Sequence, residues 1–98
     1  MKVLITDMFN DSVIEFAKRH NISKICVFTD EVIKPESDGI SIETVPLDLW
    51  KNYVHEIIDE NIEAIYIWIN DVKMLLKLSK EILIKFPEVY IVYNNEII

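Results

Sequence analysis

Short runs of consecutive apolar residues, separated by segments with helical spacing, constrain the fold of this chain most. Val3-Leu4-Ile5 is the first run, and residues 24–29 contain the second. A strand that is apolar at consecutive positions is covered on both faces, as in a parallel sheet with helices on each side. We therefore expect an α/β domain in which strands and helices alternate.

The segment after the first run carries the signals of a helix. Ser12 and Glu15 fit a capping box, in which the serine hydroxyl accepts from an amide of the first turn and the glutamate reaches back. This pattern predicts a helix from Ser12 to about His20. Asn21 follows, and we expect it to end the helix in the left-handed conformation that asparagine tolerates.

Two further helices are expected in the second half of the chain. One opens at Pro46 and Asp48, and the other begins after Asn70 or Asp71 and is ended by Pro87. The first of these two helices has an apolar stripe that would face the core. The stripe comprises Trp50, Tyr53, Val54, Ile57 and Ile58.

Three further strands are predicted. Residues 40–44 alternate between apolar and polar, which indicates a strand with one wet face near a sheet edge. Residues 64–69 predict a central strand, and residues 89–93 predict the last one before a tight turn at Asn94-Asn95. The loop over residues 30–38 is long enough for the third strand to run parallel to the second, and we favour this over a hairpin.

Together these elements predict a single α/β domain over residues 1–98. The expected fold class is a three-layer Rossmann/flavodoxin-like sandwich with about five mostly parallel strands and three helices. A domain of this length buries only about 65% of the surface of its unfolded chain. Its stability would therefore gain from a partner.

The net charge of −7 is concentrated in the middle of the chain, where residues 30–63 hold ten acids and two lysines. This acidic segment disfavours nucleic-acid binding through a broad basic surface. No apolar run approaches the roughly 18 to 20 residues that span a bilayer, and the start lacks the pattern of a signal peptide, so we expect a cytoplasmic protein without membrane association. Abundant isoleucine, lysine and asparagine indicate an AT-rich genome.

Gly39 is the only glycine, and this excludes most nucleotide-binding loops, which need glycine where the backbone approaches phosphate. We therefore expect no organic cofactor. Cys26 lies in an apolar run and is interpreted as a core residue. His20 and His55 are too few for a zinc site; His20 is expected to interact favourably with a helix end, and His55 to lie on a solvated face.

The start of the chain resembles one enzyme family. Lys2-Val3-Leu4-Ile5-Thr6-Asp7, with Val13-Ile14-Glu15-Phe16-Ala17-Lys18 behind it, is similar to the opening of the N-terminal half of D-2-hydroxyacid dehydrogenases. The resemblance covers about the first thirty residues and implies a βαβ unit. It implies no activity, because that family needs a glycine-rich NAD domain and catalytic Arg, Glu and His groups for which this chain has no room. Ile69-Asn70-Asp71 also departs from the family's Arg-Ser-like turn.

Four carboxylates are expected at the carboxyl ends of the strands, where parallel sheets bind ligands. They are Asp7, Asp11, Asp30 and Asp71. Such a rim could hold Mg²⁺ or Mn²⁺, which prefer oxygen ligands, and would suit a phosphohydrolase, a nuclease or a receiver-like small-nucleotide sensor. Aspartate is also a common helix cap and turn residue, and we favour this structural interpretation.

The third helix carries the other candidate site. Lys73, Lys77, Lys80, Glu81 and Lys85 share one arc with the apolar Ile84. We expect a two-fold homodimer through this helix and the last strand, with an interface at Lys77, Ile84, Tyr90, Tyr93, Ile97 and Ile98. The leading hypothesis is thus a non-catalytic domain that acts through protein association. The metal-dependent enzyme or sensor is the alternative.

Overall fold

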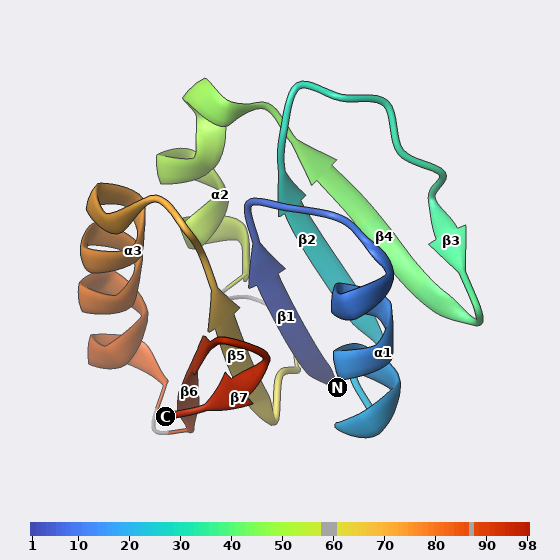
Figure 1. Cartoon of the computed structure of the whole chain (residues 1–98). Coiled ribbons are helices and arrows are strands. Elements are labelled where there is room, and N and C mark those ends of the chain that lie inside the picture. The colour runs from blue at the N-terminus through green and yellow to red at the C-terminus, as the bar shows by residue number, and fades with distance from the viewer. Residues whose placement is uncertain (58–60, 87) are drawn as a thin grey trace.

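Five parallel strands form the centre of the structure, a computed structural model that describes residues 1–57, 61–86 and 88–98, without the side chains of residues 54–57 (Figure 1). Their order is β4-β2-β1-β5-β6, with β1 in the middle. Their bounds are β1 Lys2–Thr6, β2 Lys24–Phe28, β4 Ile40–Val45, β5 Ala64–Trp68 and β6 Val89–Tyr93. The prediction of an α/β fold with a mostly parallel sheet is confirmed.

Both edges of the sheet are completed by two-residue strands that the sequence analysis did not predict. β3 (Glu36–Ser37) pairs antiparallel with β4, and β7 (Glu96–Ile97) pairs antiparallel with β6. Positive φ angles at Asp38 (51°) and Gly39 (80°) form the first turn, and those at Asn94 (50°) and Asn95 (63°) form the second. The tight turn predicted at Asn94-Asn95 is therefore confirmed, and it makes a hairpin.

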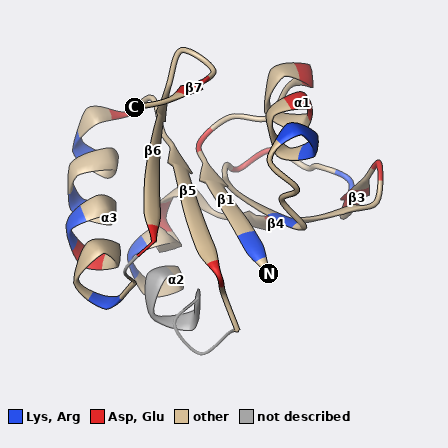
Figure 2. Ribbon diagram, turned by 90° about the horizontal axis from the view of Figure 1, so that it is seen from below, with Lys and Arg blue, Asp and Glu red and all other residues tan. Residues whose placement is uncertain are grey.

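Helices cover both faces of the sheet. α1 (Asp11–Arg19) packs on one face, and α2 (Trp50–Ile57) and α3 (Val72–Lys85) lie beside each other on the opposite face (Figure 2). Alternation along β1 directs Val3 and Ile5 toward α2 and α3 and directs Leu4 toward α1. A short 3-10 helix, η1 (Leu47–Leu49), precedes α2. Within the described part of the chain, no helix is both long enough and apolar enough to cross a membrane.

The start of α1 differs from the predicted capping box. The helix begins at Asp11, and Asn10 is its cap, because the Asn10 side chain accepts the backbone N–H of Val13 at 3.0 Å. Ser12 and Glu15 lie exposed in the first two turns of the helix. The capping box was therefore wrong by two positions, and this register is the one that buries Val13 against the sheet.

The end of α1 confirms the prediction for Asn21. Asn21 has a φ of 57°, and its N–H donates to the carbonyl of Lys18 at 3.3 Å. The N–H of Ile22 donates to the carbonyl of Ala17 at 2.9 Å, and the Ile22 side chain is buried. These two bonds and the apolar contact make a complete Schellman motif without glycine.

Most of the other predictions about strands and helices agree with the structure. β4 runs parallel to β2, as favoured, and Asp71 caps α3 by accepting the N–H of Met74 at 3.1 Å. Trp50 and Tyr53 of the predicted α2 stripe pack against the core. Val54, Ile57, Ile58, His55 and Pro87 belong to predictions that lie outside the described residues or side chains.

Candidate functional site

The acidic rim is built around Asp7, which follows β1. β1 and β5 are parallel neighbours, with Thr6 opposite Trp68, so the segments that follow both strands leave the same edge of the sheet. The backbone N–H of Asn70 lies 3.0 and 3.1 Å from the two carboxylate oxygens of Asp7, and the N–H of Asp71 lies 3.0 Å from one of them. Asp7 therefore joins the end of β1 to the start of α3.

The other predicted rim carboxylates have separate surroundings. Asp71 caps α3, and Asp30 accepts the backbone N–H of Leu47 at 3.2 Å. Asp11 lies exposed in the first turn of α1. Among the residues that the structure describes, no group of three or more His, Cys, Asp or Glu side chains is placed to hold a metal ion. The predicted metal site at Asp7, Asp11, Asp30 and Asp71 stays a prediction, and three of these carboxylates already serve backbone amides.

The position of Asp7 matters for ligand binding. In open parallel sheets, ligands bind beyond the carboxyl ends of two neighbouring strands whose connections run on opposite faces of the sheet. In this sheet those two strands are β1 and β5. An anionic ligand at such a place uses the free N–H groups at a helix start. The Asp7 carboxylate already accepts the N–H groups of Asn70 and Asp71 just before α3. An anionic ligand would therefore have to compete with Asp7 for these two donors.

His20 ends α1 rather than lying in a cluster of metal ligands. Its ring packs against Phe16, at 4.3 Å between centroids, and against Tyr66, at 5.6 Å. Burial, followed by the charges of Arg19 and Lys2, lowers the pKa of His20 below its usual 6.5. A favourable interaction between protonated His20 and the helix end would raise this pKa, so that expectation is not supported.

Cys26 is fully buried, as predicted, and takes part in a polar contact that the sequence analysis missed. Its Sγ lies 2.7 Å from the hydroxyl of Tyr53, which donates to the Glu43 carboxylate at 2.9 Å. Glu43 also pairs with Lys24 at 3.0 Å. Burial, then Cys26 and Glu43, raise the pKa of Tyr53 above its ordinary value. The contact links α2 to β2 and β4, and Cys26 is 0% exposed.

The predicted dimer residues are accessible but do not form one surface. Lys77 is exposed, and Ile84 is 77% exposed on α3. Tyr90 stacks on Tyr66 on the α1 side of the sheet, at 5.0 Å between ring centroids, whereas alternation along β6 places Tyr93 on the α3 side. Ile97 and Ile98, at the end of the chain, are exposed.

A different apolar surface on α3 was missed. Val72, Leu76 and Leu83 are 66%, 66% and 57% exposed, and Ser79 lies between them along the helix. The spacing of these four positions is four, three and four residues, which is the heptad pattern of helices that pair. We call Val72, Leu76, Ser79 and Leu83 the α3 seam. The spacing is present in the sequence, but the exposure of the three apolar side chains is a property of the folded structure.

Two pockets lie on the α1 side of the sheet. The first, of about 290 Å³, lies between Phe9, β4 and the segment before β3. The second, of about 260 Å³, lies at the ends of β5 and β6, and its lining includes Trp68, Asn70 and the Asn94-Asn95 turn.

The comparisons with known proteins give no relative. The chain matches no protein-family model, no curated protein and no solved structure. The resemblance of the first thirty residues to D-2-hydroxyacid dehydrogenases therefore gains no support, and function must be argued from the surface and the rim.

Proposed function

We propose that this chain is a non-catalytic cytoplasmic domain that acts through protein association and forms a homodimer through the α3 seam. The observation that carries the proposal is the exposure of Val72, Leu76 and Leu83 in one line on a helix of 14 residues. Fully burying such a side chain contributes about 1.5 to 3 kcal/mol, so each of these three offers about half of that to an interface.

The spacing of the seam favours another helix as its partner. Side chains at heptad positions interlock with those of a facing helix along a continuous line. The neighbouring helix α2 leaves the seam open, whereas a second copy presents a helix with the same spacing. A two-fold homodimer buries the seams of both copies in one interface, and it is the commonest form of oligomer.

The charges beside the seam favour parallel helices in the dimer. Lys73 and Lys80 are exposed and, by helical spacing, flank the seam on one side only. A two-fold axis parallel to the helices would place the lysine side of each α3 against the other, lysine-free side of its partner's seam. An antiparallel pair would oppose lysines with lysines, so charge complementarity supports the parallel arrangement.

A stable dimer needs a larger surface than the seam alone. A stable interface buries about 800 Å² on each partner, and a helix of 14 residues is only about 21 Å long. Leu47 and Leu49 of η1, on the same side of the sheet, are also exposed. We include them in the proposed interface, while Lys77, Tyr93, Ile97 and Ile98 are candidates for its periphery.

The assignment to a Rossmann-like three-layer sandwich is also a proposal. It is supported by the order of the five parallel strands, which counted along the chain is third, second, first, fourth, fifth, as in dinucleotide-binding folds. The metal-dependent phosphohydrolase, nuclease or sensor has less support, because Asp7, Asp30 and Asp71 accept backbone N–H groups.

Light scattering at micromolar concentration tests the homodimer. We expect a dimeric wild type, and we expect Leu76→Glu combined with Leu83→Glu to be monomeric, because two carboxylates would have to be buried at the interface. Ile84→Glu is the control: it places one such carboxylate at a more exposed position of the same helix and should leave the dimer intact. Circular dichroism verifies that each variant is folded.

Other outcomes are equally informative. A monomeric wild type would overturn the homodimer. A dimer that survives the double change, and is lost with Ile84→Glu or with a chain ending at Asn95, would place the interface on the lysine arc or the last residues instead.

A further inference from the structure

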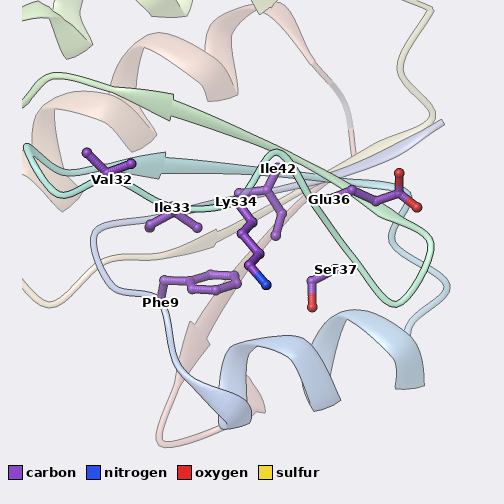
Figure 3. A pocket seen from close by; sticks show the side chains of 7 residues that line it. All are labelled: Phe9, Val32, Ile33, Lys34, Glu36, Ser37 and Ile42. Carbon is purple, nitrogen blue, oxygen red and sulfur yellow. The ribbon is translucent and has the colours of Figure 1, made fainter.

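The pocket of about 290 Å³ lies where the chain passes from β2 to β4 without a helix (Figure 3). A connection between parallel strands is usually a helix that covers the face of the sheet. Here the residues between β2 and β3 cross the α1 side of β4 as an irregular segment. The pocket is lined by Phe9, Val32, Ile33, Lys34, Glu36, Ser37 and Ile42.

Apolar groups form the floor and two walls of the pocket. Ile42 on β4 is buried, and the partly buried Phe9 and Ile33 pack against the same core cluster (Figure 3). These side chains come from three separate segments of the chain, so the folded structure is required to assemble them. They would cover the ring or the branched chain of a small organic molecule.

The polar groups of the pocket are a cation and a hydroxyl. The Lys34 amine points into the space between Phe9 and Ser37, whereas the Glu36 carboxylate points away from it (Figure 3). Within the described part of the chain, Lys34 has no ion pair or hydrogen bond. The nearby Asp38 carboxylate is paired with Lys18 at 2.9 Å instead. The pocket thus offers one unpaired positive charge beside apolar walls.

We propose that this pocket binds a small organic monoanion, with a single ring or a short branched chain and one carboxylate. The apolar part would lie against Phe9, Ile33 and Ile42, and the carboxylate would accept hydrogen bonds from Lys34 and Ser37. The volume lies near the lower limit of about 300 Å³ for ligand pockets, which excludes a dinucleotide. A phosphate with two charges would need a second cation, and Lys34 is the one cation among the described residues that line the pocket.

Nuclear magnetic resonance titration tests the site with two matched probes. Phenylacetate carries the ring and the carboxylate, and phenylacetamide has nearly the same shape without the charge. We expect millimolar phenylacetate to shift the amide signals of Phe9, Ile33, Lys34, Ser37 and Ile42. Phenylacetamide should bind up to about fivefold more weakly, which corresponds to an exposed ion pair. Added salt should reduce this difference.

Variants assign the charge preference to Lys34. Lys34→Met keeps the aliphatic stem and should make the two probes bind equally, and Lys34→Arg should restore the preference. Lys51→Met removes an exposed lysine on the opposite side of the sheet and should change nothing.

Two results would overturn the proposal. If neither phenylacetate nor the branched 4-methylpentanoate shifts the amides that line the pocket, no monoanion site exists there. If both phenylacetate and phenylacetamide bind equally to the wild type, or if Lys34→Met keeps the preference for the anion, the pocket does not recognise a carboxylate through Lys34. The homodimer through α3 lies on the other side of the sheet and is not affected by either result.

Discussion

Asp7 and Asn70 are 63 positions apart in the sequence, yet the backbone N–H of Asn70 lies 3.0 and 3.1 Å from the two carboxylate oxygens of Asp7. Asp71 donates its own N–H to the same carboxylate at 3.0 Å. We predict that Asp7→Ala lowers the free energy of unfolding by about 1 to 2 kcal/mol, because two backbone N–H groups lose a charged acceptor and only partly recover it from water. Urea unfolding measures the change.

The matched control is Asp11→Ala. Asp11 is exposed in the first turn of α1, so its removal should cost at most about 0.5 kcal/mol through the lost interaction with the helix start. Equal losses for the two variants would contradict a specific role for Asp7.

The same contact predicts the response to divalent metals. A metal ion at Asp7 would compete with the N–H groups of Asn70 and Asp71 for the carboxylate oxygens. We therefore expect calorimetry with millimolar Mg²⁺ or Mn²⁺ to give no heat of binding. Binding to the wild type that disappears in Asp7→Asn would restore the metal-dependent alternative, since it would show that the carboxylate is available.

The raised pKa of the Tyr53 hydroxyl predicts how the free energy of unfolding changes at alkaline pH. Burial, and then Cys26 and Glu43, raise the pKa of its hydroxyl, whereas in the unfolded chain it ionises near pH 10. Above pH 10 only the unfolded state releases the proton readily, so the folded state should lose stability as the pH rises. Tyr53→Phe should be about 1 kcal/mol less stable at neutral pH, because it loses a hydrogen bond.

The difference between wild type and Tyr53→Phe should shrink above pH 10, where the variant has no group to titrate. Urea unfolding at neutral pH and above pH 10 measures it. A difference that stays constant with pH would indicate that Tyr53 ionises in the folded protein.

Ser79 offers a stabilising change. Its hydroxyl oxygen is buried and has no hydrogen-bond partner among the residues that the structure describes. We expect Ser79→Ala to raise the free energy of unfolding by about 1 kcal/mol, because it removes an unpaired polar group and favours the helix. Thermal unfolding measures this, with Ser12→Ala at an exposed position of α1 as the control for helix propensity. A loss of stability would reveal a partner for the hydroxyl.

The parallel orientation of the proposed dimer predicts which cysteines cross-link. In a parallel pair, Leu76 and Leu83 each face the same residue of the other copy, so Leu76→Cys and Leu83→Cys should each form a disulfide-linked dimer. The native Cys26 is buried and does not compete. Non-reducing electrophoresis detects the products. Cross-linking only between Leu76→Cys and Leu83→Cys chains that are mixed would indicate antiparallel helices.

Local sequence patterns predicted most of the fold because each rests on neighbouring residues. The consecutive apolar residues of β1 and β5 indicated buried strands. Asn21 was placed correctly as a helix end, and the cap of α3 is Asp71, one of the two residues expected there. The start of α1 was wrong because Asn10 and Ser12 are both good capping residues. The structure selects Asn10, whose side chain accepts the backbone N–H of Val13.

The candidate sites were harder to predict because they depend on contacts between distant segments. The position of Asp7 at the sheet edge followed from the pattern, but its contact with Asn70 depends on the pairing of β1 with β5. Strands of two residues, such as β3, are too short to show an alternating pattern. The exposure of Leu76 depends on how α2 and α3 pack, which the helical spacing of α3 alone does not determine.

The two short edge strands have a consequence for how copies of this chain can meet. A long, flat edge strand recruits the edges of other molecules and leads to fibrils. β3 and β7 are each two residues long, and each begins with a glutamate. β3 comes directly before a tight turn, and β7 comes directly after one. Copies that approached edge to edge would find little backbone to pair and would bring like charges together. Both edges of the sheet thus disfavour polymerisation, and this fits the proposal that copies of the chain meet through a helix and form a closed dimer.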